Sequence, residues 1–235
     1  MAIGTLLYEG KSKQVYDYDK DTCVIRFKNT ATAGNGEKKE EFEDKGKLNA
    51  AISNLIYHYL EANGIKTHLV EVLDETSVRA KKVEVLMVEV IVRNLAAGSF
   101  SKRYGVAEGT KLKNTTTEFS LKSDALGDPL IADSHITAIG IATKAELKYL
   151  TAQALKINKL LQKFFKEAGI RLVDFKLEFG RCADGIVLCD EISPDSCRLW
   201  DWKTNEKLDK DRFRRDLGGV MEHYKDVLRR IQGVK

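Results

Sequence analysis

Three charged residues with alternating spacing, Asp174, Lys176 and Glu178, are the side chains of this sequence best suited to chemistry. The residues that alternate with them, between positions 173 and 179, are apolar. Side chains two apart share a strand face, so the pattern predicts a strand with one buried and one charged face. For these residues alone, a solvated charged face is the alternative.

A tight turn is predicted to bring a fourth charged residue, Asp190, onto the same face. Residues 183–185 have the composition of a three-residue hairpin loop, with Gly185 supplying the positive φ angle. That register places Glu178 directly opposite Asp190. Two carboxylates with no soft ligand nearby suit Mg²⁺, which takes a few carboxylates together with phosphate and water. We therefore predict a magnesium site at Glu178 and Asp190.

Lys11 and Lys13, which follow Gly10 near the start of the chain, are candidates for binding phosphate. Their spacing predicts that both ammonium groups lie on one strand face, and Gly10 and Ser12 would let a ligand approach the backbone. The segment is not a Walker A motif, and two lysines that face solvent are the alternative.

A second candidate anion site begins at Arg93, where a long β-branched segment ends. Gly98 and Ser99 are predicted to open a short helix, whose free N–H groups favour phosphate. Arg214 and Arg215, in a helix predicted from 209 to 232, could also reach a phosphate. Basic residues that face water are the alternative in both places.

Two long helices and several strands must position these residues. Apolar spacing of three and four predicts helices over 42–63 and 143–168, and Thr143 and Glu146 form a capping box for the second. The other predictions are short strands within 6–28, a loop at 29–36, a charged connection at 37–44, strands at 67–73 and 77–93, and short strands with loops at 105–142. This order predicts an α+β fold with two lobes around a cleft.

The composition excludes several classes of protein. The chain has 235 residues, of which 43% are hydrophobic and 31% charged, so disorder is not indicated. A net charge of +4 is small for a dedicated nucleic-acid binder but allows a local basic cleft. No apolar run is long enough to span a bilayer, and the four cysteines lack C-x-x-C spacing. We expect a cytoplasmic protein with reduced thiols.

Four collinear motifs resemble those of the SAICAR synthetase family, and the resemblance covers nearly the whole chain. The motifs are YEGKSKQVY, EVIVRNLAAGSFSKRYG, LVDFKLEFG and DEISPDSCRLWD, and DKDRFRRDLGG near the end also fits. The family implies a two-lobed, ATP-grasp-like α+β fold with antiparallel sheets and flanking helices. An N-terminal nucleotide-binding lobe would span 1–84, and a C-terminal lobe with the metal and substrate sites would span 85–235.

The resemblance also implies a reaction of purine biosynthesis. ATP, the carboxylated aminoimidazole ribotide CAIR and L-aspartate would give SAICAR, ADP and phosphate. A carboxylate is a poor acyl donor, so an acyl phosphate is the expected intermediate, and the site must close to keep water from it. The family also leads us to expect a homodimer or larger homo-oligomer, with neither nucleic acid nor membrane as a partner.

The resemblance assigns roles to the candidate residues and leaves the base for the aspartate amine open. The expected roles are ATP binding by Gly10, Lys11, Ser12, Lys13, Val15, Lys81 and Met87, CAIR binding by Arg93, Ser99, Arg198 and Arg214, magnesium binding by Glu178 and Asp190, and catalysis by Lys176 and Asp174. Lys176 would stabilise the transferring phosphoryl group. Two residues depart from the family pattern: Met87 replaces a common proline, and Asn35 replaces a common aspartate.

Two other functions compete with this interpretation. Another ATP-dependent ligase or a small-molecule kinase would share the paired carboxylates and lysines, whereas Arg93, Ser99 and Arg198 favour an anionic ribotide as acceptor. An RNA-binding domain would present aromatic side chains among lysines and arginines on one sheet face. Phe175 and Phe179 fall on the face opposite the charges, which argues against RNA binding.

Overall fold

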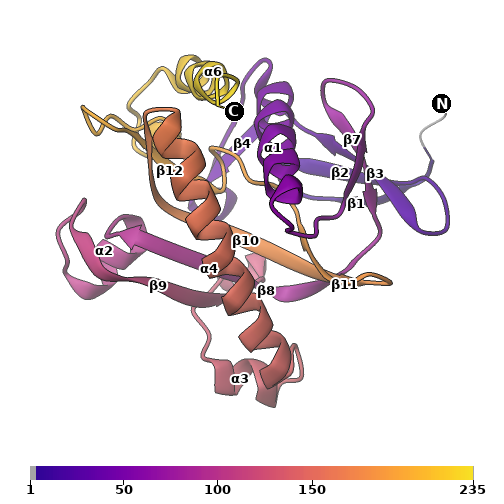
Figure 1. Ribbon diagram of the computed structural model, residues 1–235. Coiled ribbons are helices and arrows are strands. Elements are labelled where there is room, and N and C mark those ends of the chain that lie inside the picture. The colour runs from indigo at the N-terminus through magenta and orange to yellow at the C-terminus, as the bar shows by residue number, and fades with distance from the viewer. Residues whose placement is uncertain (1–3, 235) are drawn as a thin grey trace.

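The computed structural model describes residues 4–234, apart from the side chain of Asn35. Two five-stranded sheets and a two-stranded hairpin make up its β structure, and helices pack around them (Figure 1). Neighbouring strands within the sheets pair antiparallel. The predicted α+β fold with antiparallel sheets and flanking helices is confirmed.

The first sheet has the strand order β1-β2-β3-β7-β6. Its strands are β1 (Leu6–Glu9), β2 (Lys13–Asp17), β3 (Thr22–Phe27), β6 (Leu69–Val72) and β7 (Ser77–Lys81). Helix α1 (Lys45–Ala62) packs on this sheet and buries Ile52 and Ile56 in the core with Ile25 of β3. Figure 1 shows α1 beside these strands, as its apolar spacing predicts.

The predicted loop and charged connection at 29–44 instead contain a hairpin of β4 (Thr30–Ala33) and β5 (Lys38–Glu41). The short helical turn η1 (Gly34–Gly36) joins them, and its two glycines have positive φ angles that allow the chain to reverse. Lys38 Nζ donates to the backbone oxygen of Phe213 at 2.7 Å. The hairpin is therefore attached to the C-terminal part of the chain.

The second sheet has the order β11-β10-β8-β9, with β12 also paired to β10. Its strands are β8 (Glu84–Leu95), β9 (Lys111–Leu121), β10 (Ile170–Cys182), β11 (Gly185–Cys189) and β12 (Cys197–Asp201). The prediction of one strand over 77–93 is wrong, because the chain crosses from the first sheet to the second at residues 82–83. The prediction of only short strands over 105–142 is also wrong, since β9 is 11 residues long.

The hairpin of β10 and β11 differs from its predicted register by one residue. Cys182 pairs with Gly185, so the loop has two residues, and Glu178 pairs with Cys189 rather than Asp190. Asp190 is the first residue after β11, with φ 66°. The buried face is as predicted, because Phe175 and Phe179 lie in the core.

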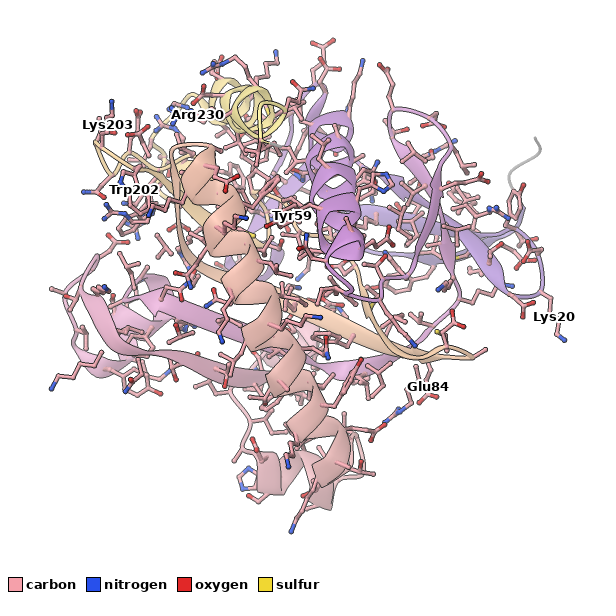
Figure 2. All side chains as sticks on the ribbon, viewed as in Figure 1. Lys20, Tyr59, Glu84, Trp202, Lys203 and Arg230 are labelled. Carbon is pink, nitrogen blue, oxygen red and sulfur yellow. The ribbon has the colours of Figure 1, made fainter. Side chains whose placement is uncertain are left out.

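Besides α1, two further predicted helices are confirmed. Helix α4 (Lys144–Glu167) has the capping box of Thr143 and Glu146 and packs on the second sheet. Figure 2 shows Tyr59 between α1 and α4, where its hydroxyl donates to the backbone oxygen of Leu160 at 3.4 Å. Helix α2 (Gly98–Tyr104) is the short helix predicted after Arg93. The remaining short helical elements of this region are η2 (Asp124–Leu126) and α3 (Asp133–Ala138).

The single helix predicted over 209–232 is wrong. The segment forms α5 (Asp211–Arg214) and α6 (Val220–Ile231), separated by a break in which Gly218 and Gly219 have positive φ angles. Leu217 lies in this break with 47% of its surface exposed, rather than in the core. Arg214, the last residue of α5, lines the cleft described below.

The main core cluster contains side chains from both sheets, including Ile25 of β3 and Phe175 of β10. Backbone hydrogen bonds between residues 66–68 and Leu188 also join the two halves. The predicted lobe boundary between residues 84 and 85 falls at the start of β8, and the division stays a prediction. None of the helices within residues 4–234 combines the length and apolar character needed to cross a membrane.

Candidate active site

A cleft of about 460 Å³ runs between the first sheet, the β4–β5 hairpin, the second sheet and α5. Most of the predicted site residues line it, namely Gly10, Lys11, Ser12, Lys13, Arg93, Ser99, Asp174, Lys176, Glu178, Asp190, Arg198 and Arg214. They come from segments up to 204 residues apart in the chain, from Gly10 to Arg214. The sheets therefore assemble one polar site from the separate sequence motifs.

Lysines and carboxylates alternate at one end of the cleft. Lys176 Nζ lies 2.8 Å from Glu89 Oε1 and 2.7 Å from Glu178 Oε1. Lys122 Nζ donates to the same Glu178 oxygen at 2.9 Å. Although burial opposes the charged form, the carboxylates raise the pKa of Lys176 well above its usual range, so it stays an ammonium group.

Lys13 of β2 is buried at this end and forms ion pairs with Asp190 and Glu191. Burial alone would raise the pKa of Asp190, but Lys13 and Lys176 lower it below the usual value, so the carboxylate is ionised. Lys11 is not on the strand face that its spacing predicted. It lies in the bend between β1 and β2, where its Nζ is 2.6 Å from Asp124 Oδ1.

The carboxylates at this end fit a magnesium ion. Glu178 and Asp190 supply hard oxygen ligands, and Mg²⁺ needs only one or two carboxylates when phosphate and water complete its shell. One oxygen of the neighbouring Glu191 is buried without a hydrogen-bond partner. Within residues 4–234, no group of three or more His, Cys, Asp or Glu forms a preassembled metal cluster.

The other end of the cleft is built from arginines. Arg93 is only 2% exposed, and its Nη1 donates to Asp174 Oδ2 at 2.7 Å. Its Nε and Nη2 donate to Glu118 Oε2 at 3.0 and 2.9 Å, and Nη2 also donates to Ser99 Oγ at 3.2 Å. Asp174 accepts a second guanidinium, from Arg198 Nη1 at 3.0 Å. Arg93 is therefore fixed in orientation by carboxylates on two strands.

A second buried carboxylate continues this network. Asp211 accepts from Arg198 Nε at 2.9 Å and from Arg214 Nη1 at 2.6 Å. The backbone of Asp211 donates to Asp209 Oδ1 at 2.7 Å. A Cβ at Gly98 would lie 2.3 Å from Nη2 of Arg198, and the φ of Gly98 is 54°, so the guanidinium packs where only glycine fits.

Several residues in the cleft lining or directly behind it were not predicted from the sequence. Glu89, Glu118, Lys122 and Asp211 all bind predicted site residues. The spacing of Glu118 and Ser120 on β9 and of Lys122 directly after it was an available signal, because residues two apart share a strand face. Their partners, Arg93 on β8 and Glu178 on β10, come near only through strand pairing, which cannot be predicted from the spacing of residues.

Three residues predicted to bind the nucleotide do not line the cleft. Val15 is half-buried and packs on the main core cluster. Lys81 Nζ lies 2.6 Å from Asp184 Oδ2, and Met87 is 47% exposed. Their roles in binding adenine stay predictions, and the side chain of Asn35 lies outside the described residues.

The fold and cleft together define an enzyme-like α+β protein whose polar cleft has two chemically different ends. The family model of SAICAR synthetase matches residues 6–231, and the chain belongs to this family. The family predicted from the sequence motifs is thereby confirmed.

Curated and solved relatives agree with this assignment. The phosphoribosylaminoimidazole-succinocarboxamide synthase of Finegoldia magna is 57% identical over 97% of this chain and 99% of the relative. The crystal structure of the synthase of that name from Ehrlichia chaffeensis is 41% identical, with a TM-score of 0.95 over 98% of this chain and 100% of that one. A SAICAR synthetase solved in complex with ADP is 45% identical, with a TM-score of 0.94 over 97% and 98% of the two chains.

Proposed function

We propose that this cleft joins the carboxylate of CAIR to the amine of L-aspartate at the expense of ATP, giving SAICAR, ADP and phosphate. As a member of its family, the chain is an ATP-dependent carbon–nitrogen ligase of purine biosynthesis. The observation that carries the proposal is the division of one cleft into a lysine–carboxylate end and an arginine end. These suit a metal-bound nucleotide and an anionic ribotide, respectively.

The lysine–carboxylate end is proposed to bind the ATP phosphates. Lys11 and Lys13 supply positive charge, and the backbone beside Gly10 lies in the cleft lining. Glu178 and Asp190 would hold Mg²⁺, which when bound neutralises the charge of the phosphates during transfer. The solved relative in complex with ADP supports nucleotide binding in this family.

The arginine end is proposed to bind CAIR. Arg93, Arg198 and Arg214 present guanidinium groups, which bind phosphate or carboxylate in a bidentate manner. Ser99 adds a hydroxyl that already contacts Arg93. The buried carboxylates Asp174 and Asp211 hold these groups in place, so the ribotide meets a preorganised site.

The chemistry follows from the placement of the two ends. An oxygen of the CAIR carboxylate attacks the γ-phosphorus of ATP, ADP leaves, and an acyl phosphate forms. Lys176 lies between Glu89 and Glu178, where we propose that it stabilises the transferring phosphoryl group. The amine of L-aspartate then displaces phosphate. Thr32 to Gly34 of the β4–β5 hairpin line the cleft, and closure of this hairpin would keep water from the intermediate.

The test is ADP release from Mg·ATP with CAIR, measured with and without L-aspartate, together with detection of SAICAR. The proposal predicts that sustained ADP release requires both co-substrates and that SAICAR forms in equal amount. Sustained ADP release with an unrelated acceptor in place of CAIR would point to another ATP-dependent ligase or kinase. ADP release with neither co-substrate would retain the ATP site and reject the acceptor assignment.

We further infer a cytoplasmic enzyme that forms a homodimer or a larger homo-oligomer. The location is supported by the proposed substrates, which are intracellular metabolites, and the assembly is supported by the family resemblance alone. Sedimentation of the purified chain tests the assembly, and a sedimentation coefficient of a 26.4 kDa monomer at working concentration would contradict it.

A further inference from the structure

Formation of the amide requires a group that accepts a proton from the attacking amine. The residues that line the cleft limit which side chains can be this proton acceptor. Among the described lining residues there is no histidine. The lining carboxylates that bind at least one cation are Glu89, Asp124, Asp174, Glu178, Asp190, Glu191 and Asp195. Asp128 instead accepts from the backbone N–H of Ser123 at 2.9 Å. Burial would raise the pKa of Asp190 and Asp195, but neighbouring lysines lower it, so these two carboxylates are weak proton acceptors. Burial raises the pKa of Glu89 and Asp174, but Glu89 is held by Lys176, and Asp174 by Arg93 and Arg198.

The lysines of the lining differ from one another in their partners. Within the described cleft, every lysine except Lys210 has a carboxylate that can be assigned to it alone. The pairs are Lys11 with Asp124, Lys13 with Asp190, Lys122 with Glu178 and Lys176 with Glu89. Although burial opposes the charged form, the carboxylates raise the pKa of Lys13, Lys122 and Lys176, which makes these three ammonium groups unsuitable as bases.

Lys210 shares its carboxylate with another lysine. Its Nζ is 3.4 Å from Asp195 Oδ2, whereas Nζ of the fully buried Lys45 is 2.7 Å from the same oxygen. Tyr224 of α6 donates to the other oxygen of Asp195 at 2.7 Å. The negative charge of Asp195 is therefore already matched by Lys45. Lys210 is the surplus cation, and its side chain, 13% exposed, faces the cleft.

Burial is the main reason that the neutral form of Lys210 is favoured. Burial lowers the pKa of Lys210, and the positive charges of Arg214 on α5 and Lys45 on α1 lower it further. The charges of Asp195 and Glu191, in the loop after β11, oppose this effect without reversing it. A half-buried lysine whose pKa is lowered in this way can act as a general base.

We propose that Lys210 is the general base of amide formation in this cleft, an inference that rests on the proposed function. The uncharged Nζ takes a proton from the aspartate nitrogen as that nitrogen bonds to the carbonyl carbon of the acyl phosphate. The carbon–oxygen bond to the phosphoryl group breaks, and phosphate leaves with its electron pair. One bond forms, one breaks, and the proton ends on Lys210.

The Lys210→Arg variant tests this role, because arginine keeps the positive charge but does not act as a base. Wild type and variant are each given Mg·ATP and CAIR with either L-aspartate or hydroxylamine. Hydroxylamine is uncharged at neutral pH and traps an acyl phosphate as a hydroxamate without help from an enzymatic base. We expect Lys210→Arg to form hydroxamate at a rate near that of wild type and to lose about 10²-fold or more in SAICAR formation.

The outcomes separate this inference from the proposed function. If wild type forms neither hydroxamate nor SAICAR, the proposed function fails. If wild type forms both and Lys210→Arg loses both equally, or loses neither, Lys210 is not the base. A selective loss of SAICAR formation in Glu191→Gln, with Lys210→Arg intact, would assign the base to Glu191 instead.

Two further measurements distinguish a base from a residue that only binds aspartate. In wild type, kcat should fall at low pH as Lys210 becomes protonated, and this limb should be absent from Lys210→Arg. Lys210→Ala should be rescued by small primary amines in the aspartate reaction.

Lys207→Arg is the matched control, since Lys207 lies outside the cleft lining beside Trp200, and it should match wild type. A rise in the KM for aspartate with unchanged kcat would overturn the proposal.

Discussion

The two ends of the cleft hold their charges in different ways. At the lysine–carboxylate end, flexible ammonium groups such as Lys176 bind carboxylates that a metal ion would also bind. At the arginine end, hydrogen bonds to Asp174 hold Arg93 and Arg198 in place, and Asp174 is not one of the proposed metal ligands. Lysine is a mobile point charge, whereas the guanidinium group has a fixed, planar set of donors.

This difference indicates how each end responds to its ligand. Under the proposed function, a metal-bound nucleotide would bring charges of both signs: the metal would bind Glu178 and Asp190, and the phosphates would bind the lysines. The ion pairs at this end would then exchange partners with little change in total charge. At the arginine end an anion adds to guanidinium groups that are already oriented, so little rearrangement is needed.

The sharpest test of this contrast is Asp174→Asn at the arginine end. The variant leaves the guanidinium groups of the buried Arg93 and the half-buried Arg198 without their shared charge. We expect a loss of about 3 kcal/mol in the free energy of unfolding. We also expect use of CAIR to fall by about 10²-fold or more, since a misplaced guanidinium no longer meets its ligand. Denaturant unfolding and steady-state kinetics measure the two effects.

Asp184→Asn is the matched control, because Asp184 pairs with Lys81 at an exposed site. It should change the free energy of unfolding far less than Asp174→Asn does, because water screens an exposed ion pair. Equal effects of the two substitutions would show that burial of the arginine network does not matter.

At the lysine–carboxylate end, Lys176→Met should affect catalysis more than stability. Removing the ammonium group removes the cost of burying its charge, but it leaves the carboxylates of Glu89 and Glu178 with less positive charge beside them. We expect kcat to fall by about 10²-fold, with a small change in the affinity for Mg·ATP, because the charge acts mainly on the transferring phosphoryl group. Single-turnover phosphoryl transfer measures the effect. Normal affinity together with normal turnover would end this role for Lys176.

The arginine end should also give the protein a pH dependence through Asp209. Burial raises the pKa of Asp209 from 3.8 to about 7, and the charge of Asp211 adds to the rise. A raised carboxyl pKa means that the ionised form is disfavoured in the folded state. The stabilising contribution is therefore complete below pH 3.8 and is lost as the pH rises through about 7.

In wild type, the free energy of unfolding should fall by a few kcal/mol at most as the pH rises. Asp209→Asn has no carboxyl group at this position to ionise, so it should not show this fall. The free energy of unfolding of both proteins, measured from pH 4 to pH 8, tests the expectation. Parallel profiles for wild type and Asp209→Asn would contradict it.

The smallest expected effect is that of Ser99→Ala. The hydroxyl of Ser99 accepts one hydrogen bond from Arg93, which two carboxylates already hold. Loss of a single such bond costs about 1 kcal/mol, so KM for CAIR should rise about fivefold with kcat preserved. A change beyond about 10²-fold would mean that Ser99, rather than the carboxylates, orients Arg93.

Much of this fold was predictable because the relevant signals are local. The apolar alternation around Phe175, the apolar stripe of α4 and the capping box at Thr143 each identify an element from neighbouring residues. The break between α5 and α6 also had a local signal in Gly218 and Gly219, which the regular apolar spacing on either side concealed.

What the sequence could not predict depends on contacts between distant segments. The loop after β10 is one residue shorter than expected, and this moves Asp190 off the strand face that its position suggested. β-branched residues continue on both sides of positions 82–83, so nothing local marks the crossing between sheets. The partners of the predicted site residues, such as Glu89 and Asp211, come from other strands and helices that only the fold brings near.

The most direct test of the division of the cleft is a crystal structure of the chain with Mg·ADP and CAIR bound together. The account predicts nucleotide phosphates at Lys11 and Lys13, a metal ion on Glu178 and Asp190, and the ribotide on the arginine end. It also predicts that Lys176 exchanges a carboxylate partner while Arg93 keeps both of its own. A ribotide bound among the lysines, or an arginine network that rearranges on binding, would contradict it.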